Sequence, residues 1–226
     1  MLATGSSTLA ATKKFRNFYA RDIQELFGIR SRTGFMKLLH LLFRQNGSLI
    51  DYTNLARLSE LSRYTVRAHV EAMGIAHAVF LLPPFQGGGR REITHRPKCY
   101  AFDTGFVTFV KGWDSIREDD RGILWEHLVL DMLRTLLGND AVFYLRDKSG
   151  REVDFVIKGR RQQTSAIECK INSDHFDPAN LLIIRSIYPE GKNYVLSPNI
   201  KSSYQRRYEK LQIHFISVFD LFTINW

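Results

Sequence analysis

The chain has 226 residues, of which 44% are hydrophobic and 24% are charged, a composition typical of a folded globular protein. Its longest apolar runs are too short to cross a bilayer, and no basic segment followed by an apolar one opens the chain, so we expect neither a membrane protein nor a secreted one. The two cysteines, Cys99 and Cys169, have no metal-ligand spacing, and we expect reduced thiols in a cytoplasmic protein.

The net charge of +9 is unevenly distributed along the chain. Residues 1–110 carry 15 Lys and Arg against 7 Asp and Glu, whereas residues 111–226 carry 17 against 16. A basic half beside a near-neutral half indicates a module that binds a polyanion, joined to a second domain. The alternative is a basic surface that has no particular partner.

The first half is predicted to be mainly helical. Residues 1–14 are small and polar, and we expect a flexible segment there. Apolar residues then recur at helical spacing, and Thr53 and Ser62 are the predicted N-caps of the last two helices. The predicted helices cover residues 15–26, 33–45, 53–61 and 62–73.

The last two of these helices form a predicted helix-turn-helix. Val66, Val70 and Met73 would face inward, which leaves polar side chains of the same helix facing outward, namely Arg63, Tyr64, Arg67 and His69. Two predicted strands, 79–85 and 98–102, follow it and are joined by a basic glycine turn that contains Arg90 and Arg91. This order predicts a winged helix-turn-helix domain over residues 15–112.

A winged helix can place its second helix in the DNA major groove while the wing contacts phosphates. We therefore predict DNA as a partner, and the predicted nucleic-acid contacts are Arg63, Tyr64, Arg67, Arg90 and Arg91. The alternative is a protein-docking role, which winged helices also serve.

The second half, residues 115–226, is predicted to be an α/β domain. Its helix 122–137 would bury a stripe of Leu124, Leu128, Met132 and Leu136. The other predicted elements are strands 141–146, 151–158 and 165–170, helix 178–187, strand 193–196 and a last strand or short helix at 215–222. The first six elements have the order αβββαβ.

Two of these strands carry acidic residues beside apolar ones. Because side chains alternate along a strand, Asp154 is predicted to lie opposite the apolar face of its strand, and Glu168 and Lys170 to do the same on the next. Clustered carboxylates repel one another unless a cation lies between them, and Mg²⁺ prefers such oxygen ligands. A bound cation could generate hydroxide for phosphodiester hydrolysis, with Lys170 assisting the attacking water.

Glu126 completes the predicted site from the helix before the sheet, where it stands among bulky apolar residues. Taken alone, Glu168 and Lys170 are more typical of an exposed salt bridge, and Glu126 is more typical of an exposed helix residue. Their order along the chain favours one site, in which Glu126, Asp154 and Glu168 hold Mg²⁺ or Mn²⁺ and Lys170 takes part in catalysis.

This order of residues on an αβββαβ core resembles the PD-(D/E)xK nuclease superfamily, which implies a restriction-endonuclease-like fold. The proline of the family's first strand motif is absent, because Val153 precedes Asp154. The expected function is thus a DNA-binding protein with a Mg²⁺-dependent nuclease site.

A broader resemblance is to the C-terminal region of a prokaryotic AAA-type ATPase family. It is carried by segments 19–23 (YARDI), 80–85 (FLLPPF), 98–105 (KCYAFDTG), 125–128 (WEHL), 144–155 (YLRDKSGREVDF) and 167–170 (IECK). The chain has no Gly-x-x-x-x-Gly-Lys-[Ser/Thr] motif, so we expect no ATP site and no ATPase activity of its own. Residues 4–7 resemble the segment that closes the family's ATPase module, which implies a truncated form.

The resemblance leaves two other functions open. One is a DNA-binding protein without catalysis, and the other is a protein-interaction module that serves an ATPase partner in trans.

Overall fold

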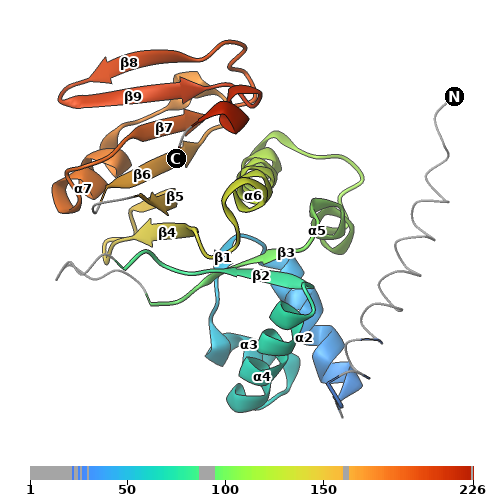
Figure 1. The fold of residues 1–226 in the computed structure, drawn as a ribbon. Coiled ribbons are helices and arrows are strands. Elements are labelled where there is room, and N and C mark those ends of the chain that lie inside the picture. Colours follow the sequence, from blue (N-terminus) through green and yellow to red (C-terminus); the bar gives the residue numbers. More distant parts are fainter. Residues whose placement is uncertain are drawn as a thin grey trace, which may run out of the picture. The chain divides into compact units, whose positions relative to one another are not determined.

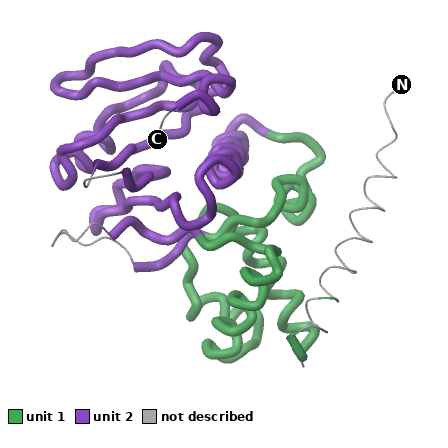
Figure 2. Tube along the Cα trace, in the orientation of Figure 1, with its two compact units in different colours: residues 1–81, 99–116 green, residues 82–98, 117–226 purple. Residues whose placement is uncertain are grey.

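A computed structural model describes residues 22, 25, 27–29, 31–86, 95–159, 163–224 and 226. The predicted flexible segment 1–14 and the predicted wing residues Arg90 and Arg91 lie outside this part of the chain. Two compact units are formed, unit 1 by residues 1–81 with 99–116 and unit 2 by residues 82–98 with 117–226 (Figure 2). The sequence analysis had instead placed residues 82–98 in the first domain. In the described residues, no helix is both long and apolar enough to span a membrane.

Unit 1 is built from helices and a small sheet (Figure 1). Its elements are α2 (Arg32–Arg44), β1 (Ser48–Leu49), α3 (Tyr52–Ser59), α4 (Arg63–Ile75), β2 (Val79–Leu82), β3 (Lys98–Ala101) and α5 (Thr104–Lys111). The strands pair in the order β1-β3-β2. Helix α2 contacts α3 and α5, and fully buried apolar side chains such as Phe35, Leu55 and Val66 form the core.

Side-chain caps begin helices α3 and α4 of unit 1. The Ser62 side chain accepts a hydrogen bond from the Thr65 N–H, which confirms the predicted cap of α4. The predicted cap Thr53 is wrong, because the Asp51 carboxylate caps α3 by accepting from the N–H groups of Thr53 and Asn54. An ionised carboxylate makes stronger hydrogen bonds to these N–H groups than a hydroxyl does.

Two features of unit 1 differ from the sequence-based expectation. His69 was predicted to face outward but is buried, with its ring edge-on to Phe35 at 5.4 Å between centroids. Helix α5 was not predicted at all. It begins at Asp103, whose side chain accepts from the Gly105 N–H, and it ends at Gly112, whose φ of 68° favours glycine.

Unit 2 contains a six-stranded mixed sheet flanked by helices. Its elements are α6 (Glu118–Leu137), β4 (Val142–Arg146), β5 (Glu152–Lys158), β6 (Thr164–Cys169), η2 (Ser173–His175), α7 (Ala179–Ile187), β7 (Asn193–Leu196), β8 (Tyr204–Tyr208), β9 (Leu211–Ile216) and η3 (Asp220–Thr223). The strand order is β4-β5-β6-β7-β9-β8, in which β6, β7 and β9 are parallel neighbours. The first six regular elements therefore follow the predicted order of helix, three strands, helix and strand.

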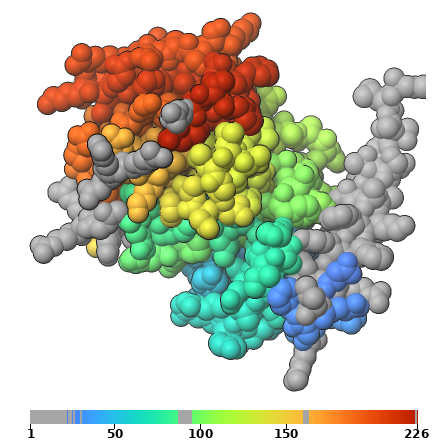
Figure 3. Space-filling model, in the orientation of Figure 1, coloured from blue at the N-terminus to red at the C-terminus, as the bar shows by residue number. Residues whose placement is uncertain are grey.

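The hairpin β8–β9 at the end of the sheet was not predicted. Strand β8 is an edge strand of polar and aromatic residues that is largely exposed, so it shows no alternation of buried and exposed positions (Figure 3, orange to red). Strand β9 does alternate, with Leu211, Ile213 and Phe215 buried on one face. Charged edge strands are common because they discourage pairing with other chains.

The two long helices of unit 2 lie on opposite sides of its sheet (Figure 1). Helix α7 packs Leu181 and Ile184 into a buried apolar cluster with sheet residues such as Ala166. Helix α6 contacts β4 and β6 and contributes nothing to that cluster. The predicted stripe of α6 is wrong, because Leu128 is 47% exposed and the buried apolar residues are instead Trp125, Val129, Leu130 and Leu133.

Strand β5 contains a β-bulge at Asp154 and Phe155. The register pairs Phe143 with Val156 but Leu145 with Val153, so two residues of β5 lie opposite the single residue Tyr144. As a result Val153 and Val156, three positions apart, contribute to the same apolar cluster. The strict alternation assumed from the sequence fails here, and bulges of this kind change the direction of a side chain.

A buried arginine connects α7 to the sheet. The Arg185 guanidinium, on a side chain only 8% exposed, donates to Asn193, to the hydroxyl and carbonyl of Thr164, and to three turn carbonyls, those of Tyr188, Glu190 and Lys192. Gly191 lies in the same turn with φ of 132°, and an added Cβ would lie 1.8 Å from the Thr164 carbonyl oxygen. Arg185 therefore has partners for all its buried nitrogens.

Candidate functional site

Unit 2 places four carboxylates and two ammonium groups close together. Three of the acids were predicted as metal ligands, namely Glu126 on α6, Asp154 in the bulge of β5 and Glu168 on β6, and Glu152 joins them from the start of β5. We call these four residues the acid cluster. The ammonium groups belong to Lys98 and to the predicted Lys170.

Asp154 lies where β5 and β6 separate. The last paired residues of this ladder are Phe155 and Ile167, and beyond them Asp154 Oδ2 accepts a hydrogen bond from the Cys169 N–H at 2.7 Å. In the described residues Asp154 makes no ion pair. Burial raises its pKa well above the ordinary value, and the negative charges of Glu168 and Glu126 raise it further.

Glu168 is the most buried member of the acid cluster, with its side chain 1% exposed. Its Oε2 accepts from Lys170 Nζ at 2.9 Å, while its Oε1 is buried and has no hydrogen-bond partner. Burial raises the pKa of Glu168, although Lys170 and the nearby Asn180 side chain favour its ionised form. A buried carboxylate oxygen without a partner is costly unless something else binds there.

Glu126 is positioned by the packing of α6 against the sheet. The neighbouring Trp125 is buried and its Nε1–H donates to the Leu196 carbonyl on β7 at 3.1 Å, which fixes this turn of the helix. Glu126 Oε1 then accepts from Lys98 Nζ at 2.9 Å. Glu126 is also near enough to raise the pKa of Asp154, as Glu168 is.

Lys98 is a functional candidate that the sequence analysis missed, and Glu152 is one that it took for a structural residue. The Lys98 side chain is 4% exposed, and its Nζ lies 2.9 Å from Glu126 Oε1 and 2.5 Å from Glu152 Oε1. Burial lowers the pKa of Lys98, but Glu126 and Glu152 outweigh burial and keep its pKa above the ordinary value. A lone lysine at the start of an apolar strand looks like a surface residue in sequence, and no local pattern indicates its burial.

The acid cluster has the chemistry of a divalent-cation site but not its finished geometry. Carboxylate oxygens are the ligands that Mg²⁺ and Mn²⁺ prefer. Within the described part of the chain, however, no three His, Cys, Asp or Glu side chains are arranged so that they could hold a metal ion as they stand. Glu126 and Glu168 are instead paired with Lys98 and Lys170. Cys169 is no ligand candidate, because burial and the neighbouring acids raise the pKa of its thiol.

The predicted nucleic-acid residues of α4 are exposed. Arg63, Tyr64 and Arg67 all face solvent, and Tyr64 is 83% exposed. The Arg67 guanidinium lies 4.9 Å above the centre of the Tyr52 ring, which holds it at the start of α3. The beginning of α4 therefore presents two cations and an aromatic ring on one surface.

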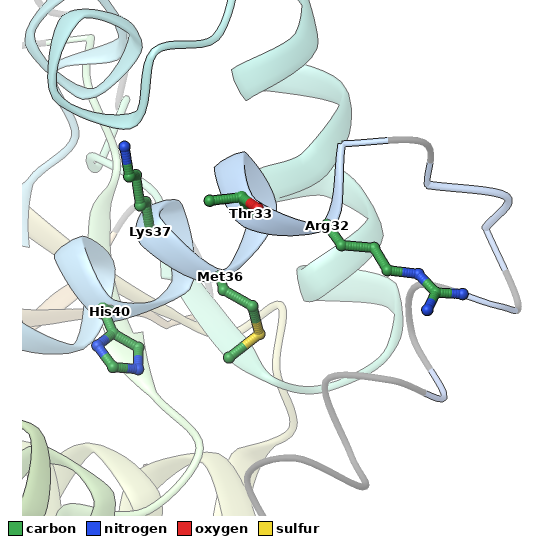
Figure 4. A pocket seen from close by; sticks show the side chains of 5 residues that line it. All are labelled: Arg32, Thr33, Met36, Lys37 and His40. Carbon is green, nitrogen blue, oxygen red and sulfur yellow. The ribbon is translucent and has the colours of Figure 1, made fainter.

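A shallow hollow of about 440 Å³ follows one side of α2 (Figure 4). Its lining residues are Arg32, Thr33, Met36, Lys37 and His40. None of the predicted site residues is among them, and Lys37 is paired with Glu60. We therefore assign no role to the hollow.

Relatives of the chain are found among mycobacterial proteins. It is 28% identical over 198 residues to the uncharacterized protein Rv2008c of Mycobacterium tuberculosis and, equally, to the uncharacterized protein Mb2031c of Mycobacterium bovis. The match covers 81% of this chain but 44% of each relative, so the chain spans less than half the length of these proteins.

Among solved structures, the chain is similar to one from a tetradecameric assembly of Thermococcus gammatolerans McrB AAA+ hexamers with bound McrC. The identity is 13% and the TM-score 0.33, with 80% of this chain and 46% of the other covered.

Two family models match the sequence. Residues 121–216 match the domain of unknown function DUF4143, which is found in proteins associated with AAA-type ATPases. Residues 3–117 match the domain of unknown function DUF8612, and this match extends over half of the chain. The protein is therefore a member of the DUF8612 family whose second half is related to DUF4143.

Proposed function

We propose that the protein binds DNA through unit 1 and hydrolyses phosphodiester bonds at the acid cluster of unit 2 with the help of Mg²⁺ or Mn²⁺. Unit 2 would then be a nuclease domain of the PD-(D/E)xK type with a restriction-endonuclease-like fold. The order α6, β4, β5, β6, α7, β7 supports this assignment, since it reproduces the αβββαβ order expected of that fold.

The observation that carries the proposal is that the ionised forms of Asp154 and Glu168 are disfavoured in the folded protein. They come from neighbouring strands, both have raised pKa values, and Glu168 Oε1 is buried without a hydrogen-bond partner. Structural ion pairs usually lower carboxyl pKa values, because the partner favours the ionised form. Two neighbouring acids whose pKa values are raised instead are typical of a site that binds a cation or transfers a proton.

Each residue of the cluster has a role in this proposal. Asp154, Glu168 and Glu126 would hold the cation, which when bound supplies Lewis acidity and an acidified water. Lys170, paired to Glu168 at 2.9 Å, would orient the attacking water and offset negative charge that develops on the phosphate. The burial around Glu168 would keep bulk water away and strengthen these interactions.

Unit 1 would hold the DNA as a winged helix. The order α2, β1, α3, α4, β2, β3 supports that fold, with α4 as the second helix of a helix-turn-helix. Arg63, Tyr64 and Arg67 would contact phosphates or base edges, and Arg90 and Arg91 would extend the contact from the wing. The basic first half of the chain would make this binding sensitive to salt.

Nicking of supercoiled plasmid with Mg²⁺ or Mn²⁺ tests the proposed catalysis. We expect nicking by the wild type and none by Asp154→Asn or Lys170→Ala. Lys148→Ala, an exposed lysine in the neighbouring turn, is the matched control and should nick like the wild type. Nicking that is equal in all four proteins would come from a contaminant and would contradict the proposal.

A second candidate function is a binding module without catalysis that serves an AAA-type ATPase. Two observations favour it, namely the relation of residues 121–216 to a family found with such ATPases and the pairing of the acids with Lys98 and Lys170. It predicts DNA or partner binding that is indifferent to divalent cations and to Asp154→Asn.

A further inference from the structure

Lys98 occupies the place in the acid cluster where a cation is needed. Its ammonium bridges Glu126 and Glu152, and Asp154 is also close enough to raise its pKa. The chain before it is held by the Tyr144 hydroxyl, which donates to the Arg96 carbonyl, and Lys98 Nζ lies 5.6 Å from the centre of the Tyr144 ring. The lysine is therefore anchored in the cluster by contacts on several sides.

The two ends of the acid cluster differ in how their charge is matched. Glu152 has two cationic partners, Lys98 and Arg146, and Glu126 has Lys98. Asp154 has no ion pair in the described residues, and Glu168 has one oxygen paired with Lys170 and the other buried without a partner. Negative charge is thus incompletely matched at Asp154 and Glu168, whereas the neighbouring Glu126 is paired with Lys98.

We infer that Lys98 is a positioning residue of the proposed site, which holds Glu126 when no metal is bound and competes with the divalent cation for that carboxylate. The inference rests on the proposed function, because it concerns the same acids. For Glu126 to become a third ligand through Oε1, that oxygen must exchange the Lys98 ammonium for the metal ion.

The competition also explains why the ligands are present but not assembled. A bridging ammonium fixes Glu126 toward Glu152, while the oxygen left open on Glu168 belongs to the other end of the cluster. Two positive charges cannot share one carboxylate oxygen at short range in a buried setting without strong repulsion. Metal binding would therefore be weaker in the wild type than in a protein without this lysine.

Titration calorimetry of the full chain with Mn²⁺ near neutral pH tests the inference. We expect Lys98→Met to bind Mn²⁺ at least about tenfold more tightly than the wild type, the smallest change expected from removing a close charge pair. Arg146→Gln is the matched control, because it removes a cation from Glu152 without touching Glu126, and its affinity should change by less than about threefold. A purely structural Lys98 would affect stability and leave Mn²⁺ affinity unchanged or weaker.

The outcomes separate this inference from the proposed function. Binding by the wild type that is lost in Asp154→Asn and tightened in Lys98→Met supports both, as does binding by Lys98→Met alone. Binding that is lost in Asp154→Asn but not tightened in Lys98→Met overturns the inference and leaves the proposed function intact. No Mn²⁺ binding by any of the proteins overturns both. If Lys98→Met does not fold, the double variant with Glu152→Gln removes one of the acids left unpaired and serves in its place.

Discussion

Arg185 and the acid cluster both place charged groups in the interior of unit 2, but they differ in how completely those groups are matched by hydrogen-bond partners. The Arg185 guanidinium donates to side chains and carbonyls of β6, β7 and the turn before β7, so its buried nitrogens all have partners. Glu168 instead keeps one buried oxygen without a partner, and Asp154 faces two other acids. The comparison teaches that burial of a charge alone does not indicate function, whereas incomplete matching of a buried charge does.

The largest expected effect is at Arg185. Arg185→Met should lower the free energy of unfolding by about 3 kcal/mol or more, because it leaves several buried acceptors without donors. Urea denaturation measures this loss, and Arg207→Met on exposed β8 should change the value by less than about 0.5 kcal/mol. An equal, small effect of both variants would show that the Arg185 hydrogen bonds do not hold α7 on the sheet.

The second effect is opposite in sign and concerns Asp154. Asp154→Asn should raise the free energy of unfolding of the metal-free protein near pH 7, because burial and the charges of Glu168 and Glu126 disfavour the ionised carboxylate and an amide carries no charge. The amide oxygen can still accept from the Cys169 N–H. Asp147→Asn is the matched control and should destabilise, because hydrogen bonds from Ser149 and Arg151 lower the pKa of Asp147 despite some burial. Loss of stability in both variants would mean that Asp154, like Asp147, is an acid whose ionised form stabilises the fold.

The stabilisation by Asp154→Asn should depend on pH. A folded-state pKa above the unfolded value means that the protonated acid stabilises the fold at low pH and that this contribution is lost as pH rises. The difference in unfolding free energy between Asp154→Asn and the wild type should therefore grow as pH rises from about 4, the ordinary carboxyl pKa. Urea titrations between about pH 4 and pH 8 measure it, and a difference that shrinks over this range would refute the assignment.

The smallest effect concerns the surface of α4 in unit 1. Arg63→Ala and Arg67→Ala should each weaken DNA binding about three- to tenfold. Each should also reduce the slope of the logarithm of the binding constant against the logarithm of salt concentration by about one. Fluorescence anisotropy with duplex DNA at several salt concentrations measures both quantities. Arg121→Ala, an exposed arginine of α6, should leave them unchanged. Equal losses in all three variants would mean that binding follows net charge rather than this helix.

Much of the fold could be predicted because apolar periodicity dominates the regular elements. Strand β7 and the helices α2 and α7 lie within a residue or two of their predicted bounds. The hairpin β8–β9 and helix α5 were missed, because β8 shows no alternation and α5 depends on caps at Asp103 and Gly112. These features are stabilised by neighbours rather than by their own pattern.

The candidate site could be predicted in part for the same reason. Asp154, Glu168 and Lys170 follow from strand alternation and their spacing, although the bulge at Asp154 changes the alternation on which the argument relied. Lys98 is 28 residues from Glu126 and 54 from Glu152 in sequence, and no local pattern links it to either. Its role depends on which strand begins beside the acids, and that is a property of the folded chain.

Thermal unfolding with and without Mg²⁺, for the wild type and Asp154→Asn, tests the central claim most directly. The account predicts that the variant is the more stable protein without metal, and that millimolar Mg²⁺ raises the unfolding temperature of the wild type alone. A wild type that does not respond to Mg²⁺, or a variant that responds equally, would contradict the claim that the acid cluster is a divalent-cation site.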